Sequence, residues 1–146
     1  MNTDVDLITA QLLPRAALLS RLLLRQSLAG VPRSEAGVLS ALSGRPHRVT
    51  ELAERVGLAQ PTMTLLVKRL QERGWVTRER DPLDARAVLV SITEAGGEAL
   101  EQTRAGYREV LARHLDAMSA EEIAALTTAT EALGHLLDVL QRGDAR

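Results

Sequence analysis

The spacing of apolar residues changes at Gly74, and this change most constrains what the chain can fold into. Residues 60–73 place apolar side chains at helical spacing, whereas residues 75–80 and 87–93 alternate between apolar and polar side chains. Residues 81–86, with the sequence DPLDAR, are charged or turn-forming. The pattern predicts a helix that leads directly into a short, solvent-facing hairpin.

A second short helix is expected immediately before this one. Thr50 can accept a backbone N–H bond and so cap a helix, and Gly57 supplies the left-handed residue that ends it. Pro61 suits the first turn of the following helix, where no amide hydrogen is needed. Two short helices joined by a tight turn make a helix-turn-helix, and the hairpin would be its wing. The residues expected between the two helices are Leu52, Val56, Leu66, Val67 and Leu70.

The N-terminal part predicts one long helix over residues 7–28, because apolar side chains recur there at helical spacing. Pro14 would be awkward inside it, so we expect the helix either to start near Pro14 or to kink there. Residues 33–42 predict a short second helix, with Ser34 as a candidate cap. Arginines interrupt the leucine-rich segment every few residues, so we expect neither a membrane span nor a signal peptide.

Two more helices are expected after the hairpin. Thr93 would cap the first, which runs to about Met118, and Ser119 would open the last, which ends near Arg142. The first and last helices carry more apolar side chains than a monomer needs to cover a winged helix, so we expect them to interlock in a homodimer. A monomeric bundle is the alternative. The apolar residues of the last helix are Leu126, Leu133, Leu136, Leu137 and Leu140.

The length of 146 residues fits one domain, and the absence of cysteine excludes disulfides and a thiol redox switch. A cytoplasmic location fits this composition best. The expected fold is mainly α with a small β-wing. We expect a single domain over residues 1–146, with a winged helix-turn-helix lobe at about 33–93 and dimerisation helices at 5–29 and 94–142.

The charge is unevenly distributed, although the net charge is only −1. Residues 44–93 carry nine Lys and Arg against six acids, which gives +3, and residues 1–43 carry +1. Residues 94–146 carry five Arg against ten acids, which gives −5. A positive middle segment suggests that one face meets an anion such as nucleic acid, although solvated helix faces would give the same counts.

The order of these elements resembles the MarR family of bacterial transcription regulators over nearly the whole chain. The resemblance is carried by LAERVGLAQPTMTLLVKRLQERGWVTR followed by DPLDARAVLVSIT. Its most specific parts are the DxRA element at residues 84–87 and the Ile92-Thr93 junction before the next helix. The resemblance implies an obligate homodimer, a repressor that binds a pseudo-palindromic operator in double-stranded DNA and responds to a small-molecule effector.

The helix that begins near residue 60 would then be the recognition helix in the major groove. Gln60 can pair with adenine, and Thr62 and Thr64 can bond bases or phosphates, although they could also be ordinary surface or capping hydroxyls. Lys68 and Arg69 are expected to contact the DNA backbone, and Arg69 could instead pair with an acid of the wing. The full set expected to bind DNA on this helix is Gln60, Thr62, Met63, Thr64, Lys68 and Arg69.

Arg86 is the DNA contact expected on the wing. A narrow minor groove concentrates negative potential on an inserted guanidinium. The resemblance implies that Asp84 holds this arginine in position, and the alternative is a local ion pair that only stiffens an exposed turn. Arg78 and Arg80 are expected to lie near phosphates.

The chain departs from the family pattern at two positions. Many relatives have Arg where this chain has Leu65, so either a phosphate or guanine contact is lost or Leu65 packs against a thymine methyl group. The usual Ser or Thr before the recognition helix is Ala59, so the cap would come from Gln60, from water or from a DNA phosphate. We therefore expect a different operator preference.

Enzyme chemistry is not expected, and neither catalytic residues nor a cofactor are assigned. The chain has no cysteine, no nucleophile-elbow serine and no glycine-rich phosphate loop. His135 and Asp138 could share a metal ion, but a solvated or interface pair is favoured, so no metal site is assigned. His47 could approach a phosphate. The histidines are His47, His114 and His135.

The family resemblance places an effector pocket between the first, second and fifth helices and the DNA-binding lobe. Trp75 and Tyr107 are the only aromatic residues, so the pocket would be mostly aliphatic. Arg15, Arg25 or Arg113 could meet an anionic ligand. The alternative to a DNA-binding regulator is a winged-helix module that binds another protein, and only the former should lose affinity steeply with salt.

Overall fold

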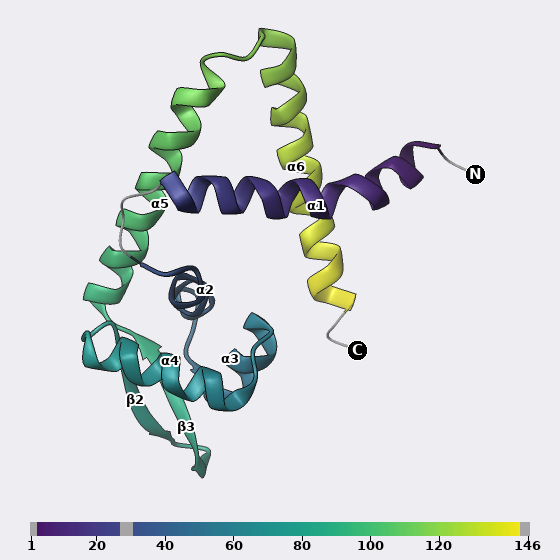
Figure 1. Ribbon diagram of the computed structural model, residues 1–146. Helices are drawn as coiled ribbons and strands as arrows, with labels where there is room; N and C mark the ends of the chain where they lie inside the picture. Colours follow the sequence, from purple (N-terminus) through teal and green to yellow (C-terminus); the bar gives the residue numbers. More distant parts are fainter. Residues whose placement is uncertain (1–2, 27–30, 144–146) are drawn as a thin grey trace. The chain divides into compact units, whose positions relative to one another are not determined.

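The computed structural model describes residues 3–26 and 31–143, and these residues form mainly helices with one small sheet (Figure 1). The chain divides into two compact units, Met1–Arg108 and Glu109–Arg146. The expected fold class, mainly α with a small β-wing, is confirmed, whereas the single domain stays a prediction. The elements are α1 (Thr3–Gln26), α2 (Arg33–Leu42), β1 (His47–Arg48), α3 (Val49–Val56), α4 (Gln60–Glu72), β2 (Val76–Asp81), β3 (Asp84–Ile92), α5 (Glu94–Leu115) and α6 (Ala120–Gly143).

The sheet is antiparallel, with its strands in the order β1-β3-β2. The expected turn over residues 81–86 is wrong, because β3 begins at Asp84, which pairs with Asp81. The hairpin closes through Pro82 and Leu83, and the backbone amides of Leu83 and Arg86 donate to the carboxylates of the two aspartates at this tight end. Strand β1 was not expected, because two residues are too few to show an alternating pattern.

Two expected helix caps are wrong, and one of the two alternatives for Pro14 is excluded. α1 runs continuously through Pro14, so the helix does not start there, and a kink at Pro14 stays a prediction. α2 follows Pro32 and α3 follows Arg48, and neither has a side-chain cap, so Ser34 and Thr50 lie inside the helices. The pairing of β1 with β3 brings the chain to the start of α3 earlier than the capping pattern indicates.

The caps of the two later helices are confirmed. The Thr93 hydroxyl accepts a bond from the amide of Gly96 at 3.1 Å at the start of α5. Ser119 and Glu122 form a reciprocal capping box: the Glu122 amide donates to the Ser119 hydroxyl at 3.2 Å, and the Ser119 amide donates to the Glu122 carboxylate at 2.8 Å. These caps depend on neighbouring residues alone, which is why local sequence revealed them.

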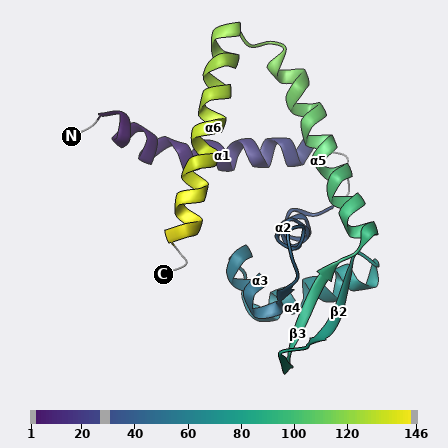
Figure 2. The same cartoon turned by 180° about the vertical axis from the view of Figure 1, so that it is seen from behind.

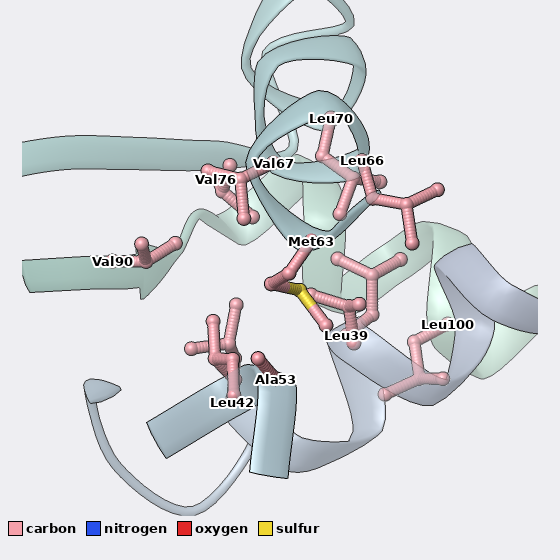
Figure 3. Close-up of a cluster of buried hydrophobic side chains, with 12 residues drawn as sticks. Leu39, Leu42, Ala53, Met63, Leu66, Val67, Leu70, Val76, Val90 and Leu100 are labelled. Atoms are coloured by element: carbon pink, nitrogen blue, oxygen red, sulfur yellow. The ribbon is translucent and has the colours of Figure 1, made fainter. Parts of the chain in front are cut away.

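The core of the lobe lies among α2, α3, α4 and the hairpin (Figure 3). α4 buries one face, because its apolar residues recur at a spacing of three and four. Met63 projects from this face into the middle of the cluster. The partners of α4 in the core include Leu39, Leu42, Leu52, Ala53, Val76, Val90 and Leu100.

A tight junction joins the base of the hairpin to α5. The amide of Thr93 donates to the carbonyl of Trp75 at 3.0 Å, and its hydroxyl donates to the carbonyl of Gly74 at 2.6 Å. A Cβ atom on Gly96 would lie 2.1 Å from the same Trp75 oxygen, so only glycine fits there without a shift of the backbone. The first turn of α5 therefore packs closely against the backbone at Trp75, just before β2.

Two helices, α1 and α6, are long and apolar enough by composition to cross a membrane, over Thr3–Arg25 and Ala120–Gly143. None of the residues in these apolar windows is buried within the chain. Helices that bury their apolar side chains against a second protein chain have the same composition, so length and hydropathy do not distinguish the two cases.

Candidate nucleic-acid interface

Helix α4 presents a polar face to solvent. The expected DNA-binding residues that are exposed on it are Gln60, Thr62, Thr64, Lys68 and Arg69. The assignment of Met63 to this set is wrong, because its side chain has no exposed surface and lies in the core (Figure 3). A helix that buries residue 63 together with Leu66, Val67 and Leu70 cannot present it to DNA.

The start of α4 has no side-chain cap. Ala59 has an extended backbone conformation, and among the residues that the structure describes no side chain, including that of Gln60, caps the start of the helix. The first-turn amides therefore remain available to water or to an anion such as a phosphate oxygen. The Thr64 hydroxyl donates to the carbonyl of Gln60 at 3.0 Å, and its oxygen can still accept a bond from a ligand.

The tip of the wing is arranged by a backbone contact. The Asp84 carboxylate accepts a bond from the amide of Arg86 at 3.1 Å. Within the part of the chain that the structure describes, the Arg86 guanidinium makes no ion pair, so the alternative of a pair that only stiffens the turn does not apply. Asp84 thus fixes the backbone at residue 86, and the exposed guanidinium is free to meet a ligand.

Arg48 links the helix-turn-helix to the wing, and the sequence did not reveal this role. Its Nε donates to the buried carboxylate of Asp81 at 2.6 Å, and the other oxygen of that carboxylate accepts the amide of Leu83 at 2.9 Å. The Leu83 amide, followed by Arg48, lowers the pKa of Asp81 below its ordinary value. The expected alternative of an ion pair from Arg69 to the wing is not found among the described residues, and Arg48 makes that link instead.

A groove of about 220 Å³ lies between the start of α4 and the wing. It brings together Gln60 and Thr64 from the helix with Arg78 and Arg86 from the hairpin, as the sequence predicted for one binding face. Arg48 and Thr50, which were not assigned to the site, also line it. The lining contains three arginines and no acid, so the groove has the charge expected of a surface that receives a phosphate backbone.

Other expected contact residues lie outside this groove. Thr62, Lys68 and Arg69 are exposed on α4 but do not line it, and Arg80 lines a separate shallow concavity on the hairpin together with Gln71. In Figures 1 and 2 the hairpin extends beyond α4. The site is therefore a helix face beside a basic groove and a projecting wing.

His47 does not approach a phosphate, and that expectation is wrong. Its side chain is buried, and Nδ1 lies 2.9 Å from the carboxylate of Glu51. This hydrogen bond, with a smaller contribution from Arg45 at 3.6 Å, lowers the pKa of Glu51 below its ordinary value. Pairing of β1 with β3 turns His47 inward, so it stabilises the start of α3.

The described residues contain no cluster of three side chains that could hold a metal ion, and His135 and Asp138 are both exposed on α6. A separate concavity of about 210 Å³ lies among α1, α2 and the Tyr107 region of α5. It is lined by Leu23, Leu24, Ala36 and Tyr107, with Arg33 as its cation. The expected cations Arg15, Arg25 and Arg113 do not line it. Burial raises the pKa of Tyr107 above its ordinary value.

The sequence pattern of the MarR family matches residues 29–87. The HTH-type transcriptional repressor MdtR of Bacillus subtilis is 30% identical over 95 residues, which are 64% of this chain and 61% of MdtR. The HTH-type transcriptional regulator YpoP of the same organism is 32% identical over 95 residues, 64% of this chain and 67% of YpoP.

Solved structures of MarR-type regulators have the same fold. Sco3205 of Streptomyces coelicolor, a MarR family regulator solved in complex with DNA, is 28% identical, with a TM-score of 0.61, and the match covers 94% of this chain and 93% of Sco3205. PcaV of the same organism, solved with its natural ligand, is 25% identical, with a TM-score of 0.61, over 85% of this chain and 89% of PcaV.

Proposed function

The chain belongs to the MarR family, and from this membership we propose that it is a transcriptional regulator that binds an operator in double-stranded DNA sequence-specifically. The observation that carries the proposal is the groove that joins Gln60 and Thr64 of α4 to Arg78 and Arg86 of the wing. A helix with exposed polar side chains beside several arginines is suited to read bases and to hold the phosphate backbone at the same time.

Each part of this surface has its own proposed contact. Gln60, Thr62 and Thr64 reach base edges in the major groove, where a glutamine pairs with adenine. Arg86 enters the neighbouring minor groove, where its guanidinium meets concentrated negative potential. The residues that contact phosphates are Arg48, Lys68, Arg69, Arg78 and Arg80.

The regulator acts as a homodimer in the cytoplasm and represses transcription from a pseudo-palindromic operator. α1 exposes Leu7, Ile8 and Leu19, and α6 exposes Leu136 and Leu140, and a second copy of the chain would cover these side chains. A two-fold dimer reads two half-sites about 34–36 Å apart, one turn of DNA.

A small-molecule effector would bind the concavity among α1, α2 and α5. PcaV, a structural relative, was solved with a natural ligand, which supports a ligand-responsive regulator. The aliphatic lining with Tyr107 and Arg33 fits a small apolar molecule with an anionic group.

Footprinting of the purified protein on the DNA that neighbours its gene tests the proposal. We expect a two-fold symmetric footprint and an affinity that falls steeply with salt. Arg86→Ala should weaken operator binding at least about tenfold, the typical effect of one lost groove contact. A protein that leaves no footprint and binds DNA without salt dependence would be a protein-docking module instead.

A further inference from the structure

Leu65 is an exposed apolar residue on a surface that is otherwise polar. Among residues 31–93, all described, the large apolar side chains that stand exposed are Leu65, at 58%, and Leu83, at 92%. A single exposed leucine is common on a protein surface, so its place on the helix decides whether it has a role.

The buried residues of α4 define where Leu65 points. Met63, Leu66, Val67 and Leu70 are buried and mark the inward side of the helix. An α-helix has about 3.6 residues per turn, so each residue points about 100° around the axis from the one before. The side of α4 opposite to the average direction of its four buried side chains carries residues 61, 65, 68 and 72. Leu65 therefore lies at the outermost line of the recognition helix, beside Lys68, where a helix in the major groove comes nearest to the bases.

We propose that Leu65 is a specificity-determining residue that contacts the 5-methyl group of a thymine in each half-site. This inference rests on the proposed DNA-binding function. The edges of base pairs in the major groove carry hydrogen-bond donors and acceptors, and the thymine methyl is their one apolar group. A leucine cannot satisfy the donors and acceptors of a G·C pair, so it disfavours that pair at the same position.

The positive charge around α4 complements the phosphate backbone of DNA, which makes DNA the partner proposed for this surface. The basic groove beside α4 carries Arg48, Arg78 and Arg86 with no acid in its lining, and Lys68 lies one turn after Leu65. These cations would hold the phosphate backbone beside the helix and so bring its outer line close to the bases. The Leu65 side chain, on the outward side of α4, would then lose its contact with water and pack against the nearest base.

Replacing thymine by deoxyuridine removes only the methyl group and tests the contact directly. The probe is a fluorescent duplex carrying the footprinted operator, in which each symmetric pair of thymines is replaced in turn, and binding of the full chain is followed by anisotropy. Burial of one methyl group changes affinity about fourfold, so loss in both half-sites should weaken binding about 15-fold. We expect one symmetric pair of positions to show this loss.

Two variants test whether the sensitivity of binding to the thymine methyl group comes from Leu65. In Leu65→Ala the difference between thymine and deoxyuridine at that position should disappear, whereas in the matched control Leu83→Ala, an exposed leucine of the wing, it should remain. If no position is sensitive to the methyl group, or if the sensitivity persists in Leu65→Ala, the assignment is overturned. In both cases salt-dependent binding and a footprint would persist, which separates this failure from failure of the proposed function.

Discussion

Alanine substitutions at two neighbouring glycines should change stability in opposite directions. A Cβ atom on Gly96 would lie 2.1 Å from the carbonyl oxygen of Trp75 and 3.0 Å from Cγ1 of Ile92, whereas a Cβ atom on Gly97 would have no atom within 4 Å. Both glycines lie near the start of α5, so the helical backbone is the same and only the surroundings differ.

The size of each effect follows from these surroundings. A forced shift in a packed site costs about 1–3 kcal/mol, and movement of the helix start would also strain the Thr93 cap, whose loss costs about 0.5–2 kcal/mol. Alanine regains about 1 kcal/mol of helix propensity at either position. We therefore expect Gly96→Ala to lower the free energy of unfolding by about 2 kcal/mol, within a range of about 0.5–4 kcal/mol, and Gly97→Ala to raise it by about 0.5–1 kcal/mol.

Thermal unfolding followed by circular dichroism measures both variants. The protein concentration must be equal in all samples, because dimer formation makes the midpoint depend on concentration. For a chain of this length each kcal/mol moves the midpoint by about 2–4 °C, so Gly96→Ala should unfold roughly 4–8 °C lower and Gly97→Ala slightly higher than wild type. Equal stability of the two variants would refute the close approach of α5 to Trp75.

Two ion pairs provide further tests. Arg73 donates to the buried carboxylate of Glu35 at 2.8 Å, so Arg73→Ala should destabilise the lobe by about 3 kcal/mol. In a double-mutant cycle, adding Glu35→Gln to Arg73→Ala should recover part of that loss. Strictly additive effects of the two substitutions would contradict the pairing. The pKa of Asp81 is lowered in the folded state, so its stabilisation is complete above the unfolded value of about 3.9 and is lost as pH falls through the folded value. In Asp81→Asn, the unfolding midpoint measured between pH 7 and 2 should fall less steeply with acid than in the wild type. An unchanged pH dependence of the midpoint would contradict the role of Asp81.

Elements that depend on local sequence could be predicted, and contacts between distant residues could not. Gly57 and Gly74 adopt the left-handed conformation, at φ of 72° and 74°, and they end α3 and follow α4 as the sequence predicted. The Arg48–Asp81 pair joins residues 33 positions apart, and neither side chain differs in its local pattern from an ordinary surface charge. Strand β1 was missed for the same reason, because only its pairing with β3 makes it a strand.

Met63 is a different kind of error, because the sequence did contain the signal. It stands between Thr62 and Thr64 in a polar segment, and it was therefore grouped with the DNA-contacting residues. The spacing of three, four and seven to the buried residues Leu66, Val67 and Leu70 places it on the inward face. The side of the helix on which a residue lies determines whether its side chain can reach a ligand, whatever the polarity of the neighbouring residues.

Side-chain contacts anchor the hairpin near its base and near its tip, and the residues that hold it differ from those proposed to bind DNA. At the base, Thr93 bonds to Gly74 and Trp75, and near the tip, Asp81 bonds to Arg48. Arg86, between these anchors, makes no ion pair within the described part of the chain. Substitutions at the anchors should therefore lower the stability of the lobe, whereas Arg86→Ala should lower only the affinity for DNA, because no contact that supports the fold depends on its guanidinium.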